Sequence, residues 1–477
     1  MTTVSPYLLA LPEIFILVMG CAILLVGLFA PRREAIVFYL SLATLAIAAF
    51  LSWKTWGFLV SGPQLAFQNS FILDKLAVIL KEFIYVSAFF TLIYSRRYNE
   101  ARNIAFLEFY VLGLFAVLGS MVLVSAYNLL TLYLGLELVA LPSYALVALR
   151  RDSKICIEAA MKYFVIGAVA SGMLLYGFSL MFGATHSLEI ATIASANLSG
   201  STQVLFLIGL VFSVVAVAFK LGAAPFHMWV PDVYQGAPTS VTLFIGGVAK
   251  ISAFALAVRL IAEALPGLVV QWQVLLIIIS ILSMAVGNIA AIIQTNLKRM
   301  LAYSSIAHMG YMLLGFLCAT PQAYSAALFY TMSYVLMTLA AFGMILLLSQ
   351  QGFEAENIKD FAGLNERHPW FALMMLVVMF SLAGIPPLVG FIAKLGVLEA
   401  LIQAHLVWLA VIAILFAVIG SYYYLRVVKA MYFDHGVATE STDCSMMVKI
   451  MMSVNTLLVL LVGVFPAWLF DVSHAAF

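Results

Sequence analysis

Charged residues are scarce in this chain of 477 residues. Only 9% of its residues are Asp, Glu, Lys or Arg, 65% are hydrophobic, and the mean hydropathy is +1.12. A soluble globular domain carries about 25% charged residues, so this composition excludes one. Apolar windows long enough for a membrane-spanning helix of about 20 residues recur along the whole chain. We therefore predict an all-α polytopic membrane protein.

Cysteine is also rare. The four cysteines, Cys21, Cys156, Cys318 and Cys444, lie far apart, with neither metal-ligand spacing nor the pattern of a disulfide framework. No Walker, dinucleotide-binding or haem-attachment motif is present. We therefore expect no metal site and no cofactor in this chain. A net charge of +2 gives no support for nucleic-acid binding.

Fourteen membrane-spanning helices are predicted from the apolar windows. The first has no basic n-region and no small-residue cleavage signal, so we interpret it as a retained helix and not as a signal peptide. The predicted spans are residues 12–30, 36–53, 72–94, 104–124, 127–149, 155–182, 204–224, 240–261, 271–294, 300–318, 323–349, 370–404, 407–431 and 446–469.

The basic residues of the loops predict the orientation of the chain. Short cytoplasmic loops are enriched in Lys and Arg, and here alternate loops carry most of these residues. One side receives Arg32, Arg33, Arg96, Arg97, Arg102, Arg150, Arg151, Lys154, Lys298, Arg299, Lys359, Arg367, Arg426, Lys429 and Lys449, and the other receives Lys54, Lys75 and Arg259. With fourteen spans both termini lie on the poorer side, which is the periplasm in a Gram-negative bacterium.

Ionisable residues also occur inside the predicted spans. Five of them carry the functional argument: Glu137, Lys220, Lys250, His308 and Lys394. A membrane-buried ionisable group costs several kcal/mol unless it is paired or hydrated, so it commonly marks an ion or proton pathway. The alternative is a set of structural ion pairs between helices. That alternative is less favoured for so many groups on separate helices.

For three further charged residues, both a structural role and a role in an ion pathway stay open. Lys162 has Glu158 one turn earlier on the same helix face, so a local ion pair is favoured over a pathway role. Lys81 and Glu82 are adjacent, point in different directions, and are candidates for packing against a neighbouring subunit.

A helix break is predicted directly after Lys220. Pro225 lacks an amide proton and clashes with the preceding turn, and Gly222 loosens the same stretch. Freed backbone groups inside a membrane must face protein or a water-filled cavity, and such breaks lie at transporter binding sites. His227 and Asp232 follow the break and are equally consistent with proton uptake and with capping or loop packing.

A second break is predicted near Pro386. The sequence FSLAGIP, which begins at Phe380, aligns with FKLGAAP, which begins 161 residues earlier at Phe219. Ser381 replaces the lysine of the first copy, and Lys394 follows thirteen residues later. The loop charges give the two broken helices opposite directions, which is the arrangement of inverted repeats in secondary transporters.

Three motifs resemble the antiporter-like proton-channel subunits of respiratory complex I. They are PFHMWVPDVYQGAP, LYLGLELVALPSYAL and GIPPLVGFIAK, and the resemblance covers nearly all of the chain. It implies a bundle of about fourteen transmembrane helices with two inverted five-helix repeats, in which helices 7 and 12 are broken. The implied divisions are residues 1–103 (helices 1–3), 104–262 (helices 4–8), 263–432 (helices 9–13) and 433–477 (helix 14).

The resemblance also implies residue roles and partners. The matching positions are Glu137 (helix 5 glutamate), Lys220 (helix 7 lysine), Lys250 (helix 8 lysine), His308 (polar link between the half-channels) and Lys394 (helix 12 lysine). FMN, iron–sulfur clusters, NADH and quinone are expected in partner subunits. The expected neighbours are antiporter-like subunit M and the small membrane subunits J and K, in the inner membrane of a bacterium.

Some relatives are distinguished by single features. Subunit M has a glutamate where this chain has Lys394, and subunit L has a long lateral helix after its bundle. Subunits of sodium/proton antiporters and of energy-converting hydrogenases share the core motifs and remain alternatives. Glu399, one turn beyond Lys394, has no assigned place in the family pattern and leaves the exit side of the path open.

The implied mechanism is electrostatic. While Glu137 is ionised and close, Lys220 is stabilised as a cation; when Glu137 moves away or is neutralised, burial disfavours the ammonium form and its proton leaves. The proton is then expected to pass through Lys250 and His308 to Lys394 and on to the non-cytoplasmic side. Quinone reduction in partner subunits would drive the switch.

Overall fold

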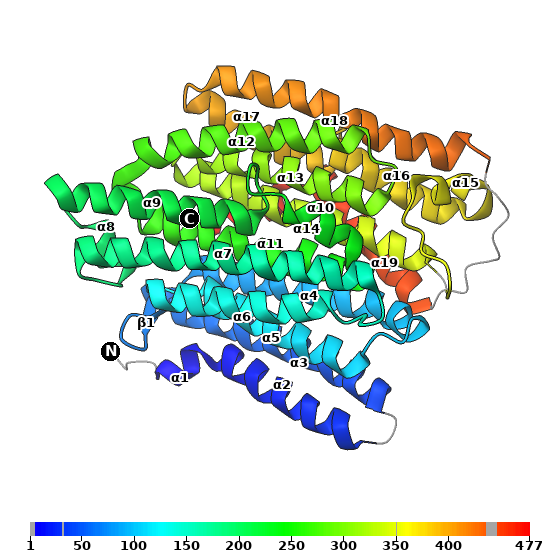
Figure 1. Ribbon diagram of the computed structural model, residues 1–477, viewed down its shortest axis with the longest axis horizontal. Coiled ribbons are helices and arrows are strands. Elements are labelled where there is room, and N and C mark those ends of the chain that lie inside the picture. Colours follow the sequence, from blue (N-terminus) through cyan, green and yellow to red (C-terminus); the bar gives the residue numbers. More distant parts are fainter. Residues whose placement is uncertain (1–4, 31–32, 350, 436–445) are drawn as a thin grey trace.

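The computed structural model describes residues 5–30, 33–349, 351–435 and 446–477, and in these residues the chain is a bundle of helices with one small hairpin (Figure 1). The helices are α1 Pro6–Leu9, α2 Leu11–Phe29, α3 Arg33–Thr55, α4 Lys75–Ala101, α5 Phe106–Val124, α6 Leu129–Val147, α7 Lys154–Thr185, α8 Ile190–Ala194, α9 Gly200–Leu221, α10 Trp229–Gly236, α11 Thr239–Ala257, α12 Val269–Ile292, α13 Leu297–Phe316, α14 Pro321–Leu348, α15 Leu364–Arg367, α16 Pro369–Ala383, α17 Val389–Gln403, α18 Val407–Phe433, α19 Met446–Val464 and α20 Ala467–Ala475. The strands are β1 Gln64–Ala66 and β2 Phe71–Leu73, which pair antiparallel.

Twelve helical segments among the described residues are long and apolar enough to cross a membrane. The predicted count of fourteen also includes two segments outside this set. One is α13, which carries Lys298, Arg299 and His308, and the other is the pair α16 and α17, each only 15 residues long. The last predicted span is shorter than expected, because α19 ends at Val464 and α20 begins after Pro466. The chain is therefore a multi-pass membrane protein, and fourteen spans remain a prediction.

The bundle has a clear centre and rim. The most apolar window of α14 is wholly buried and that of α11 almost so, whereas two thirds of the corresponding windows of α2 and α18 are not buried. In Figure 1, α2 and α18 lie at opposite edges, with α11 and α14 between them. A helix that is apolar all round belongs in the core of such an assembly, so these two central helices are the frame on which buried polar groups are positioned.

Several helices begin at a polar capping residue. The side chain of Asp74 accepts a hydrogen bond from Ala77 N, and those of Asn128, Ser153 and Asn296 cap α6, α7 and α13 in the same way. Each cap satisfies one of the amide groups that a helix start leaves unpaired. The starts of the helices that carry Glu137 and His308 are thus defined by their own sequences.

The first and last described residues lie at the end of the bundle opposite the basic loops. Tyr7 packs edge-on against Phe67 of the hairpin, which leads into the start of α4, and Arg102 of a basic loop follows the other end of α4. Phe477 packs against Tyr324 at the start of α14. The end of α14 leads to the loop that contacts Arg102. Which side of the membrane this is remains a prediction.

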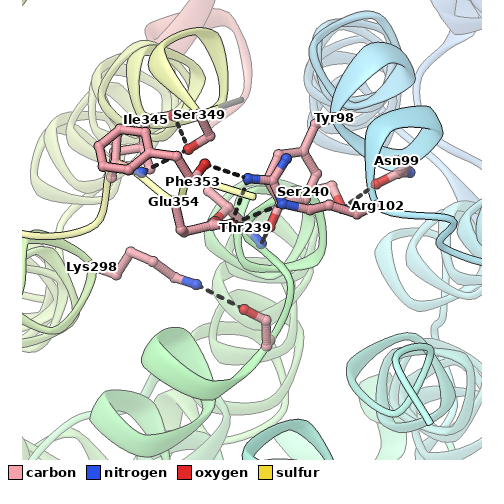
Figure 2. A network of polar contacts seen from close by, with 12 residues as sticks. Tyr98, Asn99, Arg102, Thr239, Ser240, Lys298, Ile345, Ser349, Phe353 and Glu354 are labelled. Atoms are coloured by element: carbon pink, nitrogen blue, oxygen red, sulfur yellow. Dashed lines mark hydrogen bonds and ion pairs between the residues drawn. The ribbon is translucent and has the colours of Figure 1, made fainter. Parts of the chain in front are cut away.

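Glu354 joins three parts of the bundle at the basic end (Figure 2). It lies in the loop after α14, and its carboxylate accepts hydrogen bonds from Tyr98 Oη at 2.8 Å, Arg102 Nε at 3.0 Å and Thr239 Oγ1 at 2.6 Å. Because Tyr98 lies in the last turn of α4 and Thr239 begins α11, one carboxylate connects these helices to the loop. It thereby fixes the start of the helix that carries Lys250.

Neighbouring contacts extend this network to α13. Ser240 Oγ donates to Asn99 Oδ1 at 2.8 Å, and both residues are labelled in Figure 2. Lys298 Nζ donates to Ala237 O at 2.8 Å. Leu297 N donates to Glu356 O at 2.5 Å. The start of the helix that carries His308 is therefore held to the same loop as the start of α11.

We expect Glu354→Gln to lower the stability of the assembled protein by about 1–3 kcal/mol at neutral pH, because it removes the charged acceptor of a buried network. Burial alone raises the pKa of the Glu354 carboxyl, but Lys298, Arg102 and the hydrogen bonds outweigh it, so the pKa lies below its ordinary value. A lowered pKa gives a contribution that is complete above the unfolded-state pKa and is lost as pH falls through the folded value.

The difference in unfolding free energy between the unchanged protein and Glu354→Gln should therefore be largest at pH 7 and decrease as the pH falls. Thermal unfolding of the purified assembly as a function of pH measures it. Glu34→Gln, at an exposed position, is the matched control. Equal unfolding temperatures for Glu354→Gln and the unchanged protein at pH 7 would contradict the role of this carboxylate.

Candidate functional site

The predicted break after Lys220 is present. Helix α9 ends at Leu221, and Gly222 closes its last turn with a φ of +73°. A Cβ atom at Gly222 would lie 2.5 Å from Val230 Cγ2, so a larger residue would displace the segment that follows. Residues 223–228 form an irregular turn before α10 begins at Trp229.

Lys220 and Lys250 meet at this break. A cavity of about 30 Å³ is lined by both lysines and by Tyr163, Trp229 and Ser252, with apolar side chains around the rest. This is about the volume of one water molecule. Two lysines from separate helices therefore face one space in which a water molecule can bridge them.

The broken helix end holds Lys250. Its Nζ donates to Leu221 O at 2.5 Å, and Leu221 is the last residue of α9. Carbonyl groups at a helix C-terminus lack amide partners and carry the negative end of the helix dipole, so they stabilise a cation. Lys220 Nζ has a weaker contact, a hydrogen bond of 3.3 Å to Ser171 Oγ of α7.

Glu137 lies on α6 beside these lysines. Its charge acts on Lys220, yet no described residue forms an ion pair with Glu137 within 4.0 Å. Its Oε1 atom is buried and has no hydrogen-bond partner. A buried carboxylate oxygen without a partner is costly, so the site contains an acceptor that a proton or a water molecule would satisfy.

His308 is buried among tyrosines. Its Nδ1 lies 2.7 Å from Tyr330 Oη and its Nε2 lies 3.1 Å from Tyr424 Oη, which also contacts Ser304 Oγ. The ring of Tyr334 lies 5.2 Å from the His308 ring, centroid to centroid. Both ring nitrogens therefore touch hydroxyl groups that donate or accept protons.

Lys394 lies at the second predicted break, between α16 and α17. Its Nζ donates to Ala383 O at 2.8 Å and to Leu382 O at 3.3 Å, which are the last carbonyls of α16. Gly384 closes that helix with a φ of +87°, and a Cβ atom there would lie 3.0 Å from Lys394 Nζ. Lys394 thus stabilises a broken helix end as Lys250 does.

The predicted alignment of the two breaks is wrong by one residue. Letter matching paired Phe219 with Phe380, an offset of 161. In the structure Gly222 and Gly384 each end a helix with a positive φ. The amide of the next residue then donates a hydrogen bond to the carbonyl five residues earlier, from Ala223 to Ala218 and from Ile385 to Phe380. This geometry gives an offset of 162. The sequence alignment was shifted by one residue because the small apolar residues around both breaks resemble one another. The glycine that ends each helix is the position fixed by backbone conformation, since its φ is positive.

The five predicted residues lie on adjoining helices and not in one cluster. Helix α11 packs against α9, α6 and α14, and α14 packs against α13 and α17. Lys220 and Lys250 share a cavity, whereas no hydrogen bond within the described ranges joins Lys250 to His308 or His308 to Lys394. Charge on Lys394 acts on His308. The five groups therefore lie on separate helices that adjoin one another through α11 and α14.

Lys81 has a partner that the sequence did not reveal. Its Nζ lies 2.5 Å from Glu13 Oε1 of α2, and both side chains are almost fully buried. The ring of Phe71 lies 5.1 Å from the same nitrogen. Glu82, the neighbour in sequence, has a buried Oε1 without a hydrogen-bond partner. Lys81 therefore forms its ion pair within this chain, with Glu13, and not with a neighbouring subunit.

The predicted pair of Lys162 and Glu158 is present at 2.9 Å and belongs to a larger cluster. Lys162 also contacts Asp232 at 2.9 Å, and Asp232 contacts Arg299 at 2.8 Å. Burial raises the pKa of Asp232, but Lys162 and Arg299 outweigh it and leave the pKa below its ordinary value. A cavity of about 160 Å³ is lined by all four residues. Asp232 is thus an ion-pair partner and not a loop cap.

The structure leaves the roles of two residues open. His227 is half-buried in the turn between α9 and α10, and Glu399 is exposed on α17. Arg259 is a charged residue inside an apolar segment. Its guanidinium donates hydrogen bonds to Asp74 at 2.7 and 2.9 Å and to Glu263 at 2.7 Å. Arg259 was predicted to lie in a loop, whereas it is fully buried and joins Asp74 to Glu263.

Comparisons with known proteins agree with this architecture. Residues 126–420 match the family described as "NADH:quinone oxidoreductase/Mrp antiporter, TM". NADH-quinone oxidoreductase subunit N of Coxiella burnetii is 58% identical over 472 residues, which cover 98% of both chains. The chain belongs to the NADH-quinone oxidoreductase subunit N family.

Solved structures extend the subunit N comparison to the fold. A chain of respiratory complex I from Thermus thermophilus superimposes with a TM-score of 0.83 at 32% identity, covering 98% of this chain and 100% of that one. A chain of the Mrp complex from Dietzia superimposes with a TM-score of 0.86 at only 19% identity, covering 99% and 96%. The fold alone therefore does not separate subunit N from antiporter subunits, whereas sequence identity does.

The residues that sequence analysis missed in this subunit N homologue are mainly partners. Glu13 gave a signal, since it is an acidic residue at the start of an apolar helix, but pairing with Lys81 requires two helices to pack. Glu354 lies in a polar loop where a glutamate is ordinary. Its role follows only from the contacts that converge on it.

Proposed function

We propose that this chain is the antiporter-like membrane subunit of a proton-translocating NADH:quinone oxidoreductase, and that it conducts protons across the membrane through Glu137, Lys220, Lys250, His308 and Lys394. Family membership supports the first part. The second part rests on one observation, the shared cavity of Lys220 and Lys250 at a broken helix end. A water molecule in a space lined by both lysines would donate and accept hydrogen bonds and so relay a proton from one amine to the other.

The geometry suggests how each step proceeds. Glu137, with an unpartnered oxygen, stabilises the ammonium form of Lys220 when it is ionised and near. Its withdrawal or protonation releases the proton into the cavity that Lys250 also lines. Lys250 and Lys394 are each stabilised by carbonyls of a helix C-terminus, and His308 with its tyrosines lies on a helix between them. Net transfer ends beyond Lys394, on the non-cytoplasmic side.

Electron transfer belongs to other subunits in this proposal. NADH, FMN, iron–sulfur clusters and quinone are held by partners, and conformational or charge changes from quinone reduction alter the position of Glu137. The expected membrane neighbours are subunit M and the small subunits J and K. The fourteen-helix arrangement with inverted repeats, both termini in the periplasm and residence in a bacterial inner membrane complete the proposal.

A second candidate function is favoured by the fold comparison alone. The close superposition on the Mrp complex chain is consistent with a subunit of a sodium/proton antiporter, and the shared motifs also fit an energy-converting hydrogenase. Subunits of those assemblies would use the same buried lysines. The sequence identity to named subunit N proteins makes this the less supported alternative.

Purification of the chain with its native partners in mild detergent tests the proposed function. We expect an assembly that oxidises NADH with a quinone acceptor and shows flavin and iron–sulfur absorbance. An assembly without redox centres that exchanges sodium for protons in vesicles would establish the antiporter alternative instead.

A further inference from the structure

A cavity of about 260 Å³ opens beside Lys394 toward the rim of the bundle. It lies between α13, the break that separates α16 from α17, and α18. Its outer wall includes Leu395, Ile414 and Val418, whose side chains are 39%, 48% and 66% exposed. These exposed lining residues show that the mouth of the cavity opens to the outside of the bundle, at the edge that α17 and α18 form in Figure 1.

The lining is apolar apart from its inner end. The two hydroxyl groups in it are already engaged, since Tyr311 Oη donates to Ala413 O at 3.0 Å and Ser421 Oγ donates to Val418 O at 2.7 Å. The remaining polar side chain is Lys394. The cavity is therefore amphipathic, with hydrocarbon walls and one cation.

Lys394 has bonding capacity left for an occupant. An ammonium group has three N–H donors, and the two carbonyls of α16 accept two of them. The side chain is only half-buried, because the cavity reaches it. One donor and the full positive charge are thus available inside an otherwise apolar space.

The depth of the cavity restricts the anion that can reach it. Its α18 lining, residues 413–421, begins six residues after Val407 and so lies about 9–21 Å along the helix from its start. Phosphate groups of lipids stay in the interface outside a hydrocarbon core of about 30 Å. A carboxylic acid crosses the hydrocarbon in its uncharged form and can give its proton to the neutral amine of a lysine, which yields the carboxylate–ammonium pair.

We infer that this cavity binds a long-chain fatty acid from the bilayer, with its carboxylate on Lys394 and its alkyl chain against the apolar wall of α17 and α18. A membrane-buried cation is costly unless it is paired, and a carboxylate is the complementary charge. The volume approaches the lower end of ligand pockets, about 300–1,000 Å³. The carboxyl end and first methylenes fit inside, and the remainder lies along the exposed side chains.

This binding depends only on the cavity and not on the proposed proton path. If that path is correct, a bound acid keeps Lys394 in its ammonium form and slows release at the end of the path. The test therefore measures binding and not pumping, so that failure of one proposal is distinguishable from failure of the other.

Photolabelling of membrane vesicles that contain the whole assembly tests the inference. The probe is palmitic acid with a diazirine in its alkyl chain, and labelled peptides are located by mass spectrometry. We expect label on α17 and α18 that palmitic acid displaces and that its methyl ester displaces roughly tenfold less effectively. Equal displacement by the ester would show unspecific lipid contact and overturn the inference.

Three variants sharpen the experiment. Ala417→Phe fills the cavity and should lower specific label about tenfold, whereas Leu415→Phe, on the exposed face of α18 outside the lining, should leave it unchanged. Lys394→Gln should abolish the preference for acid over ester, and Lys394→Arg should retain it. Label found on a neighbouring subunit and not on α17 or α18 would show that a protein segment covers the cavity, which also overturns the inference.

Discussion

Replacement of Lys250 by arginine is expected to lower NADH-driven proton pumping by at least about tenfold, because the loss of a positioned proton donor or acceptor typically costs about 10²–10⁴-fold in rate. Arginine retains the positive charge and can still donate to Leu221 O, the carbonyl that Lys250 binds. It does not release a proton at physiological pH. Charge and capping would therefore persist while transfer stops.

This variant separates a conducting lysine from a structural one. Pumping is measured as quenching of a pH-sensitive dye in inner-membrane vesicles, and NADH oxidation with an artificial acceptor reports how much assembly is present. Lys250→Met is the companion, since it removes the charge as well. Normal pumping in Lys250→Arg together with low pumping in Lys250→Met would mean that Lys250 only supports the helix end.

Lys81→Met is expected to destabilise the protein by about 3–5 kcal/mol, because it leaves the buried carboxylate of Glu13 without its partner. The two groups lie 2.5 Å apart and are almost fully buried. Replacement of both residues by apolar ones of similar size is often neutral or stabilising. The double variant Glu13→Leu with Lys81→Met should therefore recover most of the lost stability.

The level of assembled protein in the membrane and its unfolding temperature in detergent measure this effect. Lys54→Met is the matched control, since Lys54 is an exposed lysine on α3. A single variant as stable as the unchanged protein would show that Glu13 is satisfied without Lys81. A double variant no better than the single one would show that packing, and not the uncompensated charge, is the cause.

The membrane class and the two helix breaks were predictable from sequence because they depend on local chemistry. Apolar windows specify helices where backbone groups have no other partners, and Gly222 with Pro225 has a local preference that neighbouring helices do not override. The register of the second break was not predictable to one residue. Gly384 ends α16 because its backbone adopts a positive φ, and comparing apolar residue types in the sequence does not detect this conformation.

The buried charges of the candidate site could be identified from sequence, whereas their contacts could not, and their role in a proton path stays a prediction. Charge inside apolar spans identifies Lys220, Lys250 and Lys394 as unusual, since burial of charge needs a reason. That Lys250 binds the end of α9 depends on how α11 packs against α9. Glu354 was missed for the same reason, since its contacts come from segments far apart in sequence.

The proton-to-electron ratio of the assembly with Lys220→Ala tests the central claim most directly. Lys220 lines the cavity that it shares with Lys250, and the charge of Glu137 acts on it, so its removal interrupts the proposed path at its first lysine. The ratio is obtained by recording proton uptake and NADH oxidation in the same vesicles. The proposed path predicts a ratio clearly below that of the unchanged assembly, and an unchanged ratio would contradict it.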